Sequence, residues 1–172
     1  MRLDFYAGHC QLKWSHCSAT ANYLSAFYGE VLAAGRTRAQ LKEITHCIAY
    51  LANELMENAV KFRADGDVAI EAGLEGRCFL LRIENWIAPT TSAAFQKLLG
   101  EITAGEPGDL LIQRIEANAE GGYGSGLGLL TLMSDYGVRL SWRFGEKGDR
   151  VLLETVARLN VPAASASTAA PI

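Results

Sequence analysis

The chain has 172 residues, the length of about one domain. Hydrophobic residues make up 49% and charged residues 20%, a globular composition that argues against disorder throughout. The formal net charge of −3 gives no indication of a nucleic-acid-binding surface, and no apolar run approaches the ~18 residues that a membrane helix needs. The first residues lack the basic-then-apolar pattern of a secretion signal, so we expect a cytoplasmic protein with reduced cysteines.

The first half of the chain predicts strands, two helices and a hairpin. Thr37 and Gln40 form a capping-box pattern, and apolar residues then recur every three or four positions up to Phe62, which predicts a helix of ~25 residues. The other segments are assigned by apolar spacing and by glycine-containing turns. The expected elements are strands over 2–14 around a turn at Gly8, a helix over 20–33, the helix up to 62, and strands over 68–74 and 79–83.

The second half predicts helices followed by another hairpin. The expected elements are helices near 91–103 and 109–118, a short helix from 127 to about 136, and strands over 138–144 and 151–156. Strands joined by tight turns are antiparallel, and helices between hairpins cover one face. We therefore expect one domain over residues 1–160. Its fold class is an α+β two-layer sandwich with a mixed, mostly antiparallel sheet covered on one face by helices. Residues 161–172 are small and uncharged, which predicts a disordered tail.

Three polar side chains share one face of the long helix. Glu54, Asn58 and Lys61 are spaced four and three residues apart, beside the apolar stripe. An amide oxygen suits Mg²⁺, an ammonium group binds phosphate oxygens, and a carboxylate can accept a proton from an attacking hydroxyl. Taken alone, such a pattern is more often a solvated helix face.

Glycines alternate in a segment immediately before a predicted helix, at Gly124-Ser125-Gly126-Leu127-Gly128. Glycines at such a place let backbone N–H groups and the helix N-terminus approach an anion. The segment is not a P-loop, because no Gly-Lys-Ser/Thr follows. It is not a good Rossmann fingerprint either, because residues 116–121 are not a buried strand. Taken alone, a flexible loop explains it equally well.

Together, ELMENAVKF at 54–62 and GSGLGL at 124–129 resemble the N-box and the glycine-rich G2 box of the GHKL superfamily of ATPases. That superfamily includes histidine-kinase catalytic domains, gyrase, Hsp90 and MutL. The resemblance covers roughly residues 20–157 and implies the Bergerat fold, the histidine-kinase-like ATPase fold. A chain of one domain resembles most the stand-alone serine kinases that regulate anti-sigma factors and, within that branch, SiaB-like regulators.

The resemblance implies a role for each matched residue. Glu54 would be the general base, Asn58 the Mg²⁺ ligand and Lys61 a residue near the phosphates. The loop under the triphosphate would consist of Gly124, Ser125, Gly126, Leu127 and Gly128. Residues 88–123 would be the ATP lid. The implied cofactors are ATP and Mg²⁺.

One motif departs from the family pattern. The superfamily has D-x-G-x-G after its second central strand, where the Asp binds the adenine amino group and the glycines open the pocket. Here the segment is Asn85-Trp86-Ile87-Ala88-Pro89. Asn85 offers a side-chain oxygen to adenine, and Glu84 is an equally consistent substitute for the Asp. Trp86 falls where adenine would lie, and it would either stack on the base or fill the pocket.

The resemblance implies a serine/threonine protein kinase that phosphorylates a small STAS-domain antagonist of an anti-sigma factor in a partner-switching pathway. The added charge would break the partner complex. A sigma factor or a response regulator is a further implied partner, and paired helices near the N-terminus allow a homodimer. No nucleic-acid or membrane partner is expected. The alternative is a non-catalytic GHKL-fold pseudokinase that acts as a protein-binding regulator, which the altered segment 85–89 favours.

Two His-Cys pairs stand seven residues apart, at His9-Cys10 and His16-Cys17. Such residues can form a zinc or redox site, which makes a thiol or metal sensor a third hypothesis. Their spacing fits no usual metal knuckle. Strand residues that happen to repeat are the simpler interpretation.

Overall fold

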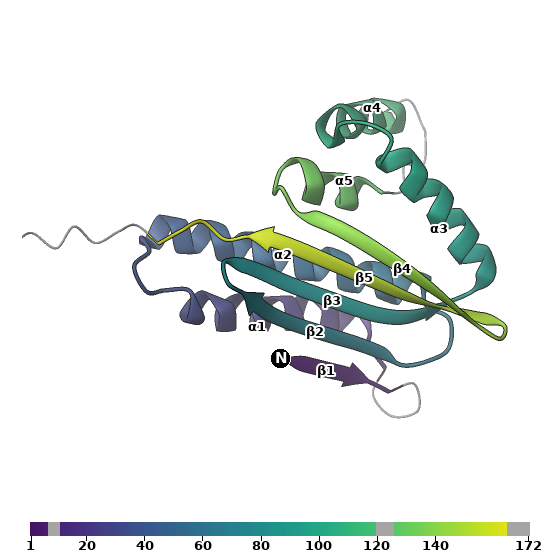
Figure 1. Cartoon of the computed structure of the whole chain (residues 1–172), viewed down its shortest axis with the longest axis horizontal. Helices are drawn as coiled ribbons and strands as arrows, with labels where there is room; N and C mark the ends of the chain where they lie inside the picture. Colours follow the sequence, from purple (N-terminus) through teal and green to yellow (C-terminus); the bar gives the residue numbers. More distant parts are fainter. Residues whose placement is uncertain (7–10, 120–125, 165–172) are drawn as a thin grey trace, which may run out of the picture.

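The computed structural model of the chain describes residues 1–6, 11–119 and 126–164. Along these ranges the elements are, in order, β1 (Arg2–Phe5), α1 (Trp14–Val31), α2 (Arg38–Phe62), β2 (Val68–Glu75), β3 (Cys78–Ile87), α3 (Pro89–Ile102), α4 (Pro107–Ala119), α5 (Leu127–Ser134), β4 (Arg139–Lys147) and β5 (Arg150–Asn160). The strands join into one sheet in the order β1-β2-β3-β5-β4 (Figure 1). Every strand pairing in these ranges is antiparallel. The described sheet is therefore antiparallel throughout, whereas the sequence predicted a mixed sheet.

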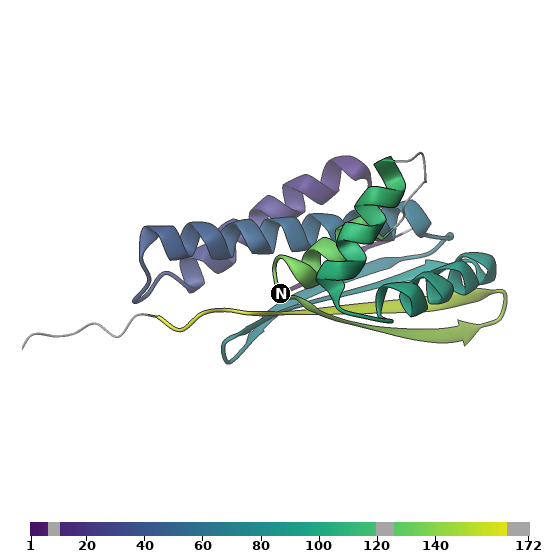
Figure 2. The same ribbon diagram turned by 90° about the horizontal axis from the view of Figure 1, so that it is seen from above.

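The molecule has two layers, the sheet and a layer of helices on one of its faces (Figure 2). Alternate residues of β3 point into the space between the layers, where Phe79, Leu81 and Ile83 are at most 1% exposed. The apolar stripe of α2 packs into the same core, with Ile48 and Leu51 fully buried. This arrangement confirms the α+β two-layer sandwich that the sequence predicted.

The long helix α2 begins and ends close to the residues that the sequence indicated. The Thr37 Oγ1 accepts a hydrogen bond from the backbone N–H of Gln40, and the Gln40 side-chain oxygen accepts one from the Thr37 N–H. This reciprocal pair satisfies two donors that the helix start would otherwise leave without partners. The last helical residue is Phe62, and Gly66 then takes a φ of +147° in the connection to β2.

The N-terminal region differs from the expectation of strands over residues 2–14. Among the residues of this range that the structure describes, β1 is the one strand, and α1 begins at Trp14 rather than at residue 20. The helix begins earlier because Cys17, Ala21 and Leu24 are spaced four and three residues apart, so that a helix buries all three against the core. Residues 7–10, which include Gly8 and the first His-Cys pair, lie outside the described residues.

The second His-Cys pair lies on α1, not on a strand. Cys17 is fully buried, and its thiol donates to the backbone oxygen of Lys13 at 3.5 Å. Among the described residues, no group of three His, Cys, Asp or Glu side chains is arranged to hold a metal ion. Within the same ranges, no helix is both long and apolar enough to cross a membrane.

The chain stays attached to the core just beyond β5. Val161 is 3% exposed, and its backbone N–H donates to the Arg77 carbonyl at 2.8 Å. The Pro162 carbonyl accepts a hydrogen bond from Arg36 at 2.8 Å. Residues 165–172, most of the expected tail, lie outside the described residues.

Candidate functional site

The structure brings the polar face of α2 and the start of α5 to one cavity. Glu54, Asn58 and Lys61 line this cavity, as do Gly126 and Gly128. The other lining residues are Trp14, Glu57, Phe62, Phe95, Leu98, Leu127 and Leu129. We call this space the polar compartment. Two motifs that are far apart in the sequence therefore lie side by side, while Gly124 and Ser125 fall outside the described residues.

Gly128 and Glu54 are in close contact across the polar compartment. A Cβ atom at Gly128 would overlap the carboxylate of Glu54, so only glycine leaves room for this side chain. Gly126 precedes α5 with a φ of +93°, a left-handed conformation that favours glycine, and its carbonyl accepts the first bond of the helix. The two glycines thus place the N-terminus of α5 directly against the α2 carboxylate.

A second carboxylate accompanies Glu54. Glu57 lines the same compartment, and the Asn53 side-chain amide donates to it at 2.8 Å. Burial raises the pKa of Glu54 above its ordinary value, and the negative charge of Glu57 raises this pKa further. A raised pKa brings a carboxylate closer to the range in which a general base works at neutral pH. Glu57 was not among the predicted site residues, although its spacing of three residues from Glu54 indicates a shared helix face.

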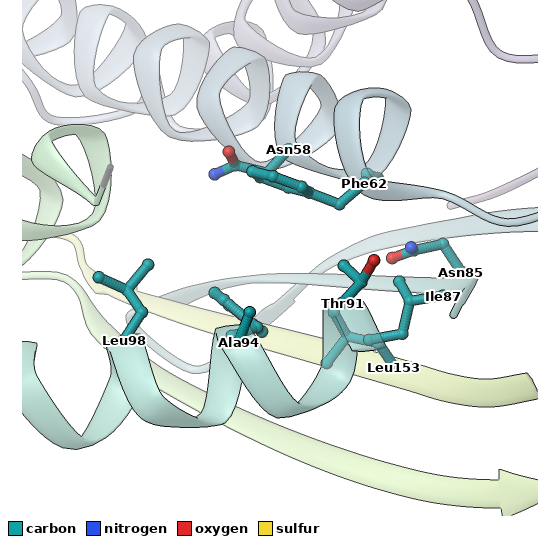
Figure 3. Close-up of a pocket in the computed structure, with 10 residues that line it drawn as sticks. Asn58, Phe62, Asn85, Ile87, Thr91, Ala94, Leu98 and Leu153 are labelled. Atoms are coloured by element: carbon teal, nitrogen blue, oxygen red, sulfur yellow. The ribbon is translucent and has the colours of Figure 1, made fainter. Parts of the chain in front are cut away.

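A second cavity adjoins the first one, between α2, α3 and the sheet (Figure 3). Its lining residues are Asn58, Ala59, Phe62, Asn85, Ile87, Thr91, Ala94, Phe95, Leu98 and Leu153. We call this space the apolar compartment. It encloses about 620 Å³, open solvent at its mouth included. The two compartments adjoin, because Asn58, Phe62, Phe95 and Leu98 line both, and we call the pair of compartments the cleft.

Asn85 is the buried polar residue of the apolar compartment. Its side chain is 2% exposed and points toward the space under α2 (Figure 3). On the neighbouring strands it stands opposite Val68 and Leu153, which are both apolar. Glu84, the equally consistent candidate from the sequence, does not line either compartment, because it lies on the opposite face of β3. Of the two candidates, Asn85 is therefore the one that lines the apolar compartment.

Trp86 does not enter the cleft, and both sequence hypotheses for it are wrong. Successive residues of a strand point to opposite faces, so Trp86 lies on the face of β3 away from Asn85. There its ring packs under Gly66, where a Cβ would overlap it. The Arg150 guanidinium lies 4.8 Å from the ring centroid. Trp86 therefore neither stacks on a ligand in the apolar compartment nor fills it.

The described part of the segment expected to form a lid is mostly helical. α3 and α4 occupy it, and α3 supplies one wall of the apolar compartment through Thr91, Ala94 and Phe95. These side chains were not predicted as site residues. No sequence pattern indicates them, because their position in the cleft depends on how α3 packs over β5.

No protein-family model matches the chain, and no curated protein matches it. Among solved structures, a chain in the crystal structure of the SiaB–SiaC complex from Pseudomonas aeruginosa is similar, with a TM-score of 0.62 and 13% sequence identity. The match covers 91% of this chain and 89% of that chain. At this identity the likeness shows a shared fold, which agrees with the two-layer sandwich described above.

Proposed function

We propose that the protein binds ATP in this cleft and is a serine/threonine protein kinase of the GHKL, anti-sigma-factor type in a partner-switching pathway. One observation carries the proposal. An apolar compartment with a buried amide adjoins a polar compartment with a carboxylate, an amide, an ammonium group and a helix N-terminus. A nucleotide needs this arrangement, because its nucleobase favours an apolar pocket and its phosphates need polar and charged groups next to it.

The polar compartment supplies the groups that a triphosphate with Mg²⁺ requires. Asn58 offers an amide oxygen at the junction of the two compartments, and Lys61 offers a positive charge beside it. The N-terminus of α5 supplies backbone N–H groups, and the missing side chain at Gly128 leaves room for the Glu54 carboxylate beside them. Bound Mg²⁺ would neutralise charge on the phosphate oxygens, and Asn58 is the residue that would hold it.

Glu54 is the proposed general base. Its half-buried carboxylate, with a raised pKa, lies between α2 and the start of α5. From there it would orient the acceptor hydroxyl and remove its proton as the phosphoryl group is transferred. General-base help of this kind contributes about 10²–10⁴-fold to the rate.

The acceptor is proposed to be a Ser or Thr of a small STAS-domain protein. The GHKL motifs support this choice, and the shared fold with a chain that was crystallised in a SiaB–SiaC complex supports a protein partner. A new phosphate on the acceptor would place about two negative charges in the interface and dissociate the complex.

Phosphate transfer from γ-labelled ATP tests the proposal. The purified chain is mixed with Mg²⁺ and each purified STAS-domain protein of its own host. We expect one acceptor to be labelled on Ser or Thr, and Glu54→Gln to lower the rate about 10²-fold or more with little change in ATP affinity. Glu43→Gln is the matched control, because Glu43 is an exposed carboxylate of the same helix and lines neither compartment.

Equal transfer by the Glu54→Gln variant would exclude Glu54 as the base. ATP binding with no transfer to any acceptor would overturn the kinase and favour the non-catalytic regulator. The altered segment 85–89 supports the non-catalytic regulator as a second candidate, because this segment lacks the two glycines of the family motif.

A further inference from the structure

Asn85 has hydrogen-bonding capacity that the fold does not use. Among the described residues its recorded polar contact runs from Nδ2 to the Trp86 carbonyl at 3.5 Å, which is long for a hydrogen bond. A buried amide without good partners costs free energy, so the position is favourable only when something else pairs with it. Because the neighbouring strand residues are Val68 and Leu153, a molecule in the apolar compartment is what can reach this amide.

A second polar group lies near it. Thr91, in the first turn of α3, turns its hydroxyl toward the space under Phe62 (Figure 3). Thr91 and Asn85 come from two different elements and line the same compartment, whose other walls are apolar apart from Asn58. In an apolar pocket, a small number of converging polar groups determines the orientation of the ligand and the specificity of the site.

The chemistry of an amide decides what it selects. A carboxylate only accepts hydrogen bonds, whereas an amide both accepts through Oδ1 and donates through Nδ2. Adenine presents an amino donor next to a ring-nitrogen acceptor, and guanine presents a ring N–H donor next to a carbonyl acceptor. A half-turn of the Asn85 amide plane exchanges its oxygen and nitrogen, so the same side chain can match either edge.

We infer that Asn85, with Thr91 beside it, selects purine nucleotides while accepting both a 6-amino and a 6-oxo base, so that the protein binds GTP as well as ATP. This inference rests on the proposed nucleotide site. A pyrimidine has a single ring and extends less far than a purine, so it would make a poorer contact with the amide when its phosphates lie beside Asn58. The selection is therefore for ring size and for a paired donor and acceptor, not for the amino group of adenine.

Calorimetric titration of the full chain with ATP, GTP and CTP, each with Mg²⁺, tests the inference. We expect Kd values for ATP and GTP within about tenfold of each other, and CTP weaker than both by more than tenfold. In the Asn85→Leu variant the side chain neither donates nor accepts, so ATP and GTP are both expected to weaken by at least about tenfold. Thr91→Val, which keeps the side-chain shape, is expected to weaken both purines. Thr90→Val is its control, because Thr90 lines neither compartment.

The wild-type titrations decide the question even if a variant at the buried position does not fold. Binding of ATP with no binding of GTP would overturn the inference and leave the proposed function standing. Equal binding of ATP and CTP would also overturn it, because the amide would then not distinguish bases. Binding of no nucleotide would overturn the inference and the proposed function together.

Discussion

At the scale of single residues, the contact between Gly128 and Glu54 is what assembles the polar compartment. Gly128 begins the first turn of α5 with Leu127, and Glu54 comes from the middle of α2. A Cβ on the glycine and the carboxylate would compete for one volume. The absence of a side chain at position 128 therefore has a local structural reason.

Replacing Gly128 with Ala is expected to displace the Glu54 carboxylate or the start of α5. We predict a loss of phosphate transfer of at least about tenfold, while circular dichroism shows a retained fold. Gly100→Ala in α3 is the control, because no atom lies within 4 Å of a Cβ built there. That control should keep its activity and gain about 0.5–1 kcal/mol of stability from helix propensity. Full transfer in the Gly128→Ala variant would contradict the proposed position of the base.

The raised pKa of Glu54 predicts a pH-dependent cost in stability. Below the ordinary pKa of a glutamate, the carboxyl is protonated in both the folded and the unfolded chain, so it costs nothing. As the pH rises through the raised pKa of the folded state, ionisation of this half-buried group destabilises the fold. Glu54→Gln should thus raise Tm at pH 7 by up to about 4 °C, because a half-exposed carboxylate contributes about 1 kcal/mol at most.

Thermal unfolding of both proteins at pH 4 and pH 7 measures this effect. The gain in Tm should shrink toward zero at pH 4, where the wild-type carboxyl is largely protonated. A gain of the same size at both values, or a lower Tm for the variant at pH 7, would show that the environment of Glu54 does not disfavour its charge.

Among the site residues, those on α2 could be predicted because a helix converts sequence spacing directly into a shared face. Glu54, Asn58 and Lys61 do line one compartment. The sequence could also have predicted that Asn85 faces the core, because Ile83 and Ile87 lie on the same face of β3. Trp86 was misplaced because a family motif was matched by position without applying the alternation of the strand.

At the scale of elements, the connection after α2 is held to the exposed face of the sheet. The Ala64 N–H donates to the Trp86 carbonyl at 2.6 Å, and Arg150 donates to the Asp65 carbonyl at 2.6 Å. The Arg150 guanidinium and Gly66 both lie against the Trp86 ring. These contacts tie α2, β3 and the start of β5 together next to the cleft but outside it.

Replacing Trp86 with Ala is expected to destabilise the fold and to leave the ligand site unchanged. Loss of the partly buried ring and of its contact with Arg150 should cost about 1–3 kcal/mol in the free energy of unfolding. Trp86→Phe keeps part of the ring and should cost less. Chemical denaturation measures the stability and calorimetry measures ATP affinity. A tenfold change in Kd for either folded variant would contradict the placement of Trp86 outside the apolar compartment.

Elements with strong local patterns were predictable and elements without them were not. β2 and β3 alternate and share a tight turn, and the capping box of α2 is formed as expected. Residues 11–13 were misassigned as strand, because this short run of mixed residues lacks a clear period. The wall formed by α3 depends on tertiary packing, which spacing in the sequence does not record.

At the scale of the whole molecule, the helices cover one face of the sheet, and the other face carries ion pairs. Arg82 pairs with Glu71 at 3.2 Å, and Arg143 pairs with Glu154 at 2.8 Å, on the face that no described helix covers. The cleft lies where the helical layer separates from the sheet, between α2 and α3. The sequence predicted the layers because hairpins and helices alternate along the chain. It predicted the meeting of α2 and α5 only through the family resemblance.

Calorimetric titration with ATP and Mg²⁺, on the wild type and on Asn58→Ala, tests the central claim most directly. Asn58 borders both compartments, so one nucleotide that spans the cleft should depend on it. We predict binding by the wild type in the micromolar range, weakened at least about tenfold in the variant and in the wild type without Mg²⁺. No binding to the wild type at millimolar ATP, or equal binding by the folded variant, would contradict a nucleotide site in this cleft.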